Sequence, residues 1–152
     1  MTHVTLYSTQ LVEDRRVELP VAALNHRDNL GEIASHLIGR HDREHLLALY
    51  INSNAHIVGV SIVSIGHVSG MTSTPKEVLR AGVILGAPAF ALAHNHPSGS
   101  LIPSDEDIAF TQAVSVGAKA LGMVMLDHVI VHFDRYRSME DECPECCVGT
   151  DG

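Results

Sequence analysis

Two histidines lie two positions apart in the string His-Asn-His-Pro-Ser-Gly that starts at His94, directly after an apolar run at residues 89–93. The run predicts a buried strand, and on a strand His94 and His96 point to the same face of the sheet. A carboxylate from the next element, Asp107, can close a His/His/Asp set around one metal ion. Three protein ligands leave a position open for water, as in catalytic rather than structural zinc sites. The pattern indicates a metal-dependent hydrolase.

A helix start brings Asp107 within reach of the histidines. Ser104 follows Pro103 and precedes Asp107 by three residues, which is the spacing of a capping box with Asp in place of Glu or Gln. The loop at residues 97–102 contains Pro, Ser and Gly and can turn tightly, so the first helical turn returns towards the histidines. We predict a helix over residues 105–121 whose inner stripe contains Ile108, Thr111, Val114, Ala118 and Leu121.

Each half of this pattern also has an ordinary structural interpretation. A histidine pair can lie on the surface at a strand end, and Ser-x-x-Asp is a common helix start. Their joint occurrence, with Pro97 and a Ser-Gly turn between them, favours a metal site. A structural Cys/His zinc site is disfavoured because no cysteine lies near these residues in the sequence.

The stretch from His94 to Asp107 resembles the JAMM motif of JAB/MPN metalloprotease-like domains, and its longer form is similar to the RadC branch of that group. The resemblance extends from about Leu11 to about Ser138. It implies an α/β fold in which a mixed β-sheet is flanked by helices, the JAB/MPN (cytidine deaminase-like) α/β sandwich. Alternating helical and strand patterns indicate the same class. Further RadC-like segments are Asp42-Arg43-Glu44, Pro75-Lys76-Glu77-Val78 and Leu126-Asp127-His128.

The resemblance also implies roles for individual residues. Glu44 corresponds to the general base that takes a proton from a metal-activated water; the alternative is a solvated glutamate at a strand end. Ser104 is implied near the oxyanion of the reacting carbonyl, and we expect this role to compete with its N-cap role for one proton. Apart from the resemblance, Asp127 and His128 begin a predicted strand whose end can approach the metal, where they would orient its ligands; the alternative is a strand-opening turn with hydrogen bonds to the backbone. The implied cofactor is one Zn²⁺ per chain, held by His94, His96 and Asp107.

Composition sets limits on the class of protein. With 152 residues, 45% of them hydrophobic, the chain is predicted to form a single domain over residues 1–140, with an N-terminal arm at residues 1–20. A formal net charge of −8 with 10 Lys plus Arg disfavours non-specific attachment to nucleic acid or to anionic lipid. No apolar stretch has the length of a membrane span and the N-terminus does not resemble a signal peptide, so we expect a cytoplasmic protein.

The three cysteines, Cys143, Cys146 and Cys147, fall within five residues near the C-terminus. An odd number so close together is not a disulfide framework. We predict that residues 141–152 form a disordered acidic tail with exposed thiols. Because Cys143 and Cys146 have Cys-x-x-Cys spacing, a metal site with a contribution from His132 and intermolecular disulfides are open alternatives.

Hydrophobic periodicity predicts the other elements. Residues 44–51 and 56–65 are expected to form a β-hairpin, with a turn at residues 52–54. Longer RadC proteins carry a helix-hairpin-helix region before this domain, and the residues before Glu44 lack its Gly-rich pattern. The remaining predictions are an edge strand or arm at 12–20, helices at 28–40 and 75–86, and strands at 67–71, 89–93, 123–131 and 136–139.

Three classes of function fit these features. The first is a zinc-dependent metallopeptidase or isopeptidase acting on a peptide or protein substrate. The second is a metal-dependent nuclease or DNA-repair accessory protein; the acidic charge and the single-metal ligand set count against it. The third is a non-catalytic MPN interaction module, which is disfavoured because such modules usually lose metal ligands that are present here. The sequence does not indicate an oligomeric state.

Overall fold

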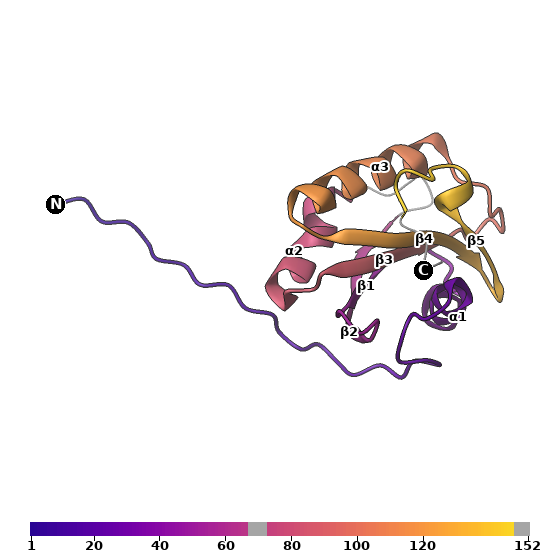
Figure 1. The fold of residues 1–152 in the computed structure, drawn as a ribbon, viewed down its shortest axis with the longest axis horizontal. Helices are drawn as coiled ribbons and strands as arrows, with labels where there is room; N and C mark the ends of the chain where they lie inside the picture. The colour runs from indigo at the N-terminus through magenta and orange to yellow at the C-terminus, as the bar shows by residue number, and fades with distance from the viewer. Residues whose placement is uncertain (67–72, 148–152) are drawn as a thin grey trace.

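The computed structural model describes residues 1–66 and 73–147, and within these residues five strands form one sheet in the order β2-β1-β3-β4-β5 (Figure 1). The central pair β3 and β4 is parallel, and every other neighbouring pair is antiparallel. The predicted α/β class with a mixed sheet is therefore confirmed. The strands are β1 His45–Ile51, β2 Ile57–Ile65, β3 Ala89–Asn95, β4 Val124–His132 and β5 Arg135–Ser138.

Helices cover both faces of this sheet (Figure 1). Helices α2 (Pro75–Leu85) and α3 (Asp105–Ala120) lie over one face, and α1 (Arg27–Ile38) lies over the other. On β3, Phe90 and Leu92 belong to the core under α2 and α3, whereas Ala91 and Ala93 belong to the core under α1. This alternation directs the next even-numbered side chains of the chain, the two histidines of the motif, towards α3.

Local sequence signals account for the helix boundaries. In α2, Thr74 and Glu77 form a capping box around Pro75, and Gly86 ends the helix in the left-handed conformation with φ of 64°. The predicted β-hairpin is also confirmed, since β1 and β2 pair antiparallel from His45 opposite Ile65. The predicted strand at residues 67–71 lies outside the described residues.

The N-terminal segment is an arm rather than a strand. Residues 1–18 are exposed and carry no regular structure, and Figure 1 shows this segment running away from the sheet. The only strand-like contact near it is an isolated bridge between Ala23 and His56, among the residues that the structure describes. Of the two alternatives predicted for residues 12–20, the structure fits an arm and does not fit an edge strand. In the described parts of the chain, no helix is long and apolar enough to span a membrane.

The C-terminal segment corrects the prediction of an exposed, disordered tail. A short 3₁₀ helix, η1 (Met139–Asp141), follows β5, and all three cysteines beyond it are buried. Cys143 and Cys146 form a disulfide, while Cys147 is a free thiol. The acidic composition of this segment suggested exposure, but the cysteines behave as small apolar side chains and pack in the core under α2 and α3. Residues 148–152 lie outside the described residues.

Candidate metal centre

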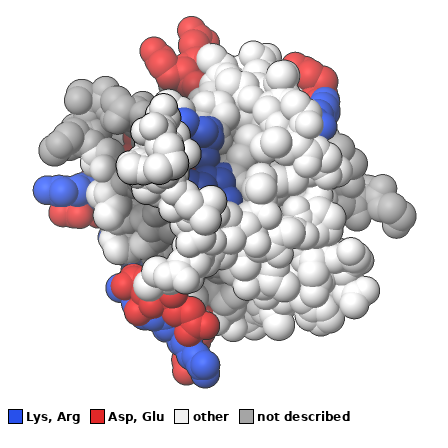
Figure 2. Space-filling view, turned by 90° about the vertical axis from the view of Figure 1, so that its left-hand side faces the viewer, with Lys and Arg blue, Asp and Glu red and all other residues white. Residues whose placement is uncertain are grey.

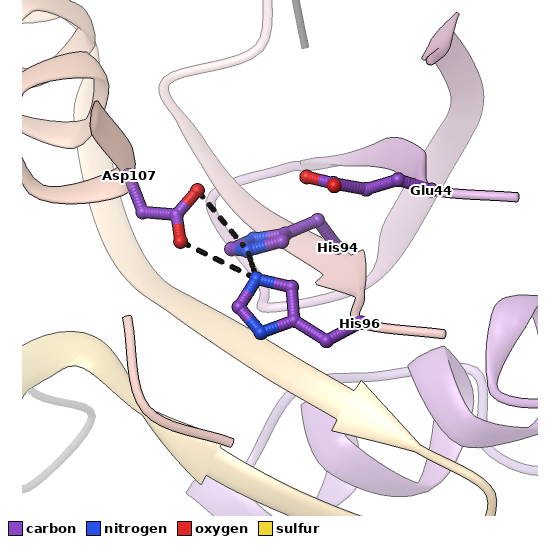
Figure 3. A group of neighbouring side chains, drawn as sticks. All are labelled: Glu44, His94, His96 and Asp107. Atoms are coloured by element: carbon purple, nitrogen blue, oxygen red, sulfur yellow. Dashed lines mark hydrogen bonds and ion pairs between the residues drawn. The ribbon is translucent and has the colours of Figure 1, made fainter. Parts of the chain in front are cut away.

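Four side chains predicted from the sequence meet at one end of the sheet (Figure 3). Glu44 directly precedes β1, His94 and His96 lie at the end of β3, and Asp107 lies in the first turn of α3. Their ligand atoms are all within 4.8 Å of one another. His94 and Asp107 are buried, whereas Glu44 and His96 are half-buried, so the cluster is reachable from the surface.

Three of these residues form a tight triangle of donor atoms. The Nε2 atoms of His94 and His96 are 2.9 Å apart, and the Asp107 carboxylate oxygens lie 3.4 Å from His94 Nε2 and 3.3 Å from His96 Nε2. Two imidazole nitrogens and a carboxylate match the donor set of catalytic zinc sites. Ligands at the usual zinc distances in a tetrahedron stand about 3.3 Å apart, which is close to the observed triangle. The residues therefore fit a metal ion.

The loop after His96 fixes how this histidine presents its ring. His96 Nδ1 donates to the carbonyl of Ser100 at 2.9 Å, which leaves Nε2 with a lone pair towards Asp107. The loop is supported from the sheet, because His132 Nδ1 donates to the His96 carbonyl at 2.9 Å. Gly99 turns the loop with φ of 88°, a conformation that favours glycine. His132 therefore supports the metal-site loop and does not join the cysteine segment.

The start of α3 places Asp107 as predicted. The Ser104 backbone N–H donates to Asp107 Oδ2 at 2.8 Å, and the Asp107 N–H donates to Ser104 Oγ at 3.1 Å, so the capping box is formed with Asp. The prediction that the N-cap role and the oxyanion role of Ser104 compete for one proton is wrong, because the N-cap uses a lone pair of the hydroxyl oxygen. Its hydroxyl proton stays available for another acceptor.

Electrostatics in the cluster favour an ionised carboxylate. Burial alone would raise the pKa of Asp107, but the neighbouring His94 and His96 rings, which donate to the carboxylate whenever Nε2 is protonated, outweigh burial and hold the pKa well below the usual range. The hydrogen bond that a protonated His96 would make with Asp107 in turn raises the pKa of His96 against the opposing effect of burial. A negative group therefore faces two ring nitrogens in the place where a cation would be bound.

Asn95, between the two histidines, positions the segment that carries Glu44. The side chain is buried, and its Oδ1 accepts the His45 N–H at 2.7 Å. Its Nδ2 donates to the carbonyls of Arg43 at 2.8 Å and of His41 at 3.2 Å. These contacts bracket Glu44 on both sides. Sequence reasoning missed Asn95, although a fully polar side chain on an otherwise apolar strand was a usable signal.

Of the two strand residues expected to orient the ligands, His128 contacts the ring of His94, whereas the hydrogen bonds of Asp127 go elsewhere. His128 Nε2 lies 2.8 Å from His94 Nδ1, and its Nδ1 lies 2.7 Å from Thr111 Oγ1. Complete burial, followed by the nearby charge of His94, lowers the pKa of His128 far below its usual value, so the ring is neutral. Asp127 accepts instead from the His128 backbone N–H and from Ser138 Oγ, both at 2.7 Å. Thr111 was predicted only as part of the helix stripe.

Comparisons with known proteins agree with this geometry. The family model described as the RadC-like JAB domain matches residues 24–144. A UPF0758 protein of Streptococcus suis is 36% identical over 132 residues, covering 84% of this chain and 54% of that protein. A UPF0758 protein of Methanococcoides burtonii is 39% identical over 114 residues, covering 73% and 50%. The chain spans about half the length of these relatives. It belongs to the RadC-like JAB domain family.

Proposed function

We propose that the protein is a zinc-dependent hydrolase of peptide or isopeptide amides. The observation that supports this most strongly is the triangle of His94, His96 and Asp107, with the Glu44 carboxylate within 4.8 Å of it. Three ligands of this kind leave a coordination position open, which structural zinc sites do not. The side chains of His96 and Asp107 are 14% and 9% exposed, so a substrate carbonyl can approach from the surface.

Each residue has a defined part in this proposal. His94, His96 and Asp107 would hold the zinc ion, which when bound acidifies a water molecule and polarises the substrate carbonyl. Glu44 takes the proton from the attacking water and passes it to the leaving nitrogen. The Ser104 hydroxyl donates a hydrogen bond to the oxyanion that develops on the carbonyl.

Zinc content and hydrolysis test these parts separately. The wild-type chain should hold about one zinc, and His96→Ala should lose it, because two remaining ligands bind weakly. His56→Ala, a change of an exposed histidine, is the matched control. Elemental analysis is made on the oxidised protein, in which Cys143 and Cys146 are joined and offer no thiolates. Full zinc occupancy in His96→Ala would place the metal elsewhere.

Glu44→Gln in the same experiment separates the base from the ligands. The amide keeps the size of the side chain but cannot accept the proton, so zinc should stay while hydrolysis falls about 10²–10⁴-fold. Glu32→Gln, an exposed change on α1, is the control. An active Glu44→Gln enzyme would remove Glu44 from the mechanism, and a zinc-free one would make it a ligand.

Surface charge favours amides over nucleic acid as the substrate. On the face in Figure 2, which lies at the end of the sheet away from the candidate metal centre, Lys and Arg appear only in a few separate places. Several arginines are also paired with acidic residues: Arg27 with Glu140, Arg40 with Asp134 and Arg137 with Glu142. Nucleic-acid enzymes normally carry a continuous basic surface along the strand that they bind.

The substrate class is tested by offering both kinds of polymer. A peptide and isopeptide library is compared with single- and double-stranded DNA, each with zinc, manganese or magnesium. We expect amide cleavage that depends on Glu44 and His94. DNA cleavage lost in both Glu44→Gln and His94→Ala, with no peptide cut, would instead support the nuclease. Zinc binding without any turnover would support an interaction module.

A further inference from the structure

We propose that His128 and Thr111 are positioning residues that lock the metal-facing tautomer of His94. They form a buried relay of hydrogen bonds that begins at the backbone carbonyl of Asp107 and ends at the His94 ring. The inference rests on the proposed zinc site. It goes beyond that site by assigning two residues that touch neither zinc nor substrate but determine whether His94 can bind.

The direction of the relay is set at Thr111. Its Oγ1 lies 2.7 Å from the Asp107 carbonyl oxygen and 2.7 Å from His128 Nδ1. A carbonyl can only accept, so the one hydroxyl proton goes to Asp107, and Oγ1 must accept from His128 Nδ1–H. The sulfur of Met139, 3.7 Å away, is a weaker acceptor. If the proton went there, two oxygens would face each other at 2.7 Å with no hydrogen between them.

The same reasoning assigns the protons on the imidazole rings of His128 and His94. A neutral imidazole has one N–H, so a His128 that donates from Nδ1 must accept at Nε2. His94 Nδ1, 2.8 Å away, is then the donor. The remaining nitrogen of His94, Nε2, carries a lone pair and faces His96 Nε2 at 2.9 Å and Asp107 at 3.4 Å. A single carbonyl thus determines that His94 presents a lone pair to the metal position.

Because the relay is buried, the tautomer of His94 is firmly fixed. His94, Thr111 and His128 are each 0% exposed, so water cannot replace a lost partner. If His128 took the other tautomer, its Nε2–H would point at His94, and His94 would have to carry its own proton on Nε2. That form cannot bind zinc. The relay also joins β3, β4 and α3, and it connects the backbone of one proposed ligand to the ring of another.

Zinc affinity in the full-length protein is the direct test, measured by competition with a chromophoric chelator. Thr111→Val keeps the shape but removes the acceptor that fixes the His128 tautomer, and His128→Phe removes the acceptor for His94. Loss of such a partner typically weakens metal binding about 10–100-fold, and we expect this range for both variants. Thr111→Ser keeps the hydroxyl and should bind zinc like the wild type.

Ser115→Ala is the matched control. Ser115 lies one turn further along α3, is buried, and donates to the Cys146 carbonyl at 3.1 Å, so this variant loses a buried hydroxyl outside the relay. Thermal unfolding of each variant separates folding from affinity. In the zinc-loaded wild type, proton–nitrogen correlation spectra of the imidazole rings should show His94 and His128 both protonated on Nδ1.

The outcomes distinguish this inference from the proposed function. A wild-type chain that binds no zinc would overturn the proposed function and the relay with it. Wild-type zinc binding with unchanged affinity in both Thr111→Val and His128→Phe would overturn the relay alone. So would zinc affinity that falls as much in Ser115→Ala as in Thr111→Val. A His128 ring protonated on Nε2 in the loaded protein would contradict the assigned direction.

Discussion

Three consecutive residues serve the candidate site from opposite faces of the sheet. His94 and His96 direct their Nε2 atoms at Asp107, on the face covered by α3. Asn95 points the other way and binds the backbone on both sides of Glu44. The strand thereby fixes the proposed ligands and the proposed base relative to each other, because one stretch of backbone carries the contacts of both.

Asn95→Asp tests this link between the histidines and Glu44. A carboxylate can still accept from His45 but cannot donate to the two carbonyls, so the free energy of unfolding should fall by about 1–3 kcal/mol. Zinc content should stay while hydrolysis falls, because the Glu44 segment loses its support. Asn52→Asp is the control: Asn52 Oδ1 only accepts, from the Asn54 and His56 N–H groups, and a carboxylate keeps both contacts. Equal stability of the two variants in urea would contradict the role of Asn95.

The sequence could identify the residues of the cluster but not those that hold it. His94, His96 and Asp107 follow a spacing whose geometry is local to a strand end and a helix start. Thr111 and Asn95 acquire their roles through partners 17 and 50 residues away, and no local pattern reveals such partners. For His128, its place at the start of a predicted strand indicated the role, whereas the direction of its hydrogen bonds could be assigned only from the position of Thr111.

At the scale of elements, helix α3 presents three functional groups on one side. Ser104 is the N-cap, Asp107 follows three residues later, and Thr111 lies one turn further on. Residues at these spacings are neighbours on a helix surface. The cap, the proposed ligand and the relay residue therefore move as one unit with the helix start.

Ser104→Gly separates the cap from the proposed oxyanion donor. Glycine is accepted at an N-cap, so the cost in unfolding free energy should be only a few tenths of a kcal/mol, compared with about 1 kcal/mol for Ser104→Ala. Both variants lack the hydroxyl, so both should lose about 10²–10³-fold in the rate of hydrolysis. Ser104→Thr keeps both roles and is the control. A Ser104→Gly enzyme with full activity would limit Ser104 to the cap.

Most elements were predictable because their signals are local. The caps at Thr74 and Ser104 and the hairpin of β1 and β2 follow from neighbouring residues. The order of the strands does not, since β3 separates β1 from β4 through pairings that span long stretches of chain. The packing of the C-terminal cysteines was missed for a related reason: the side chains that they pack with come from distant parts of the chain, in the core under α2 and α3, while the local composition is acidic.

At the scale of the whole molecule, two buried titratable groups connect the sheet to its cover. Tyr50 on β1 donates to the Val78 carbonyl of α2 at 2.6 Å. Cys147 packs in the same core from the C-terminal segment. Burial raises the pKa of Tyr50 from 10.0 to about 12. Burial, followed by the charge of Asp127, raises the pKa of the Cys147 thiol from 9.0 to about 12. Both groups are neutral when protonated, so the folded core favours the proton-bound form.

Alkaline solution should therefore weaken the whole fold. The unfolded chain releases these protons first, so the stabilisation is complete below about pH 9 and is lost as the pH rises towards about 12. We expect the free energy of unfolding to fall by a few kcal/mol between pH 8 and about pH 11, measured in urea.

The variant Tyr50→Phe tests the part of Tyr50 in this loss. Its free energy of unfolding should be about 1 kcal/mol lower at neutral pH, because one hydrogen bond is lost, but it should fall less steeply above pH 10. Tyr7→Phe, in the exposed arm, should follow the wild type. If the free energies of unfolding of Tyr50→Phe and the wild type fell in parallel over this pH range, ionisation of Tyr50 would not contribute to the loss. The sensitivity of the fold to alkali would then come from other groups.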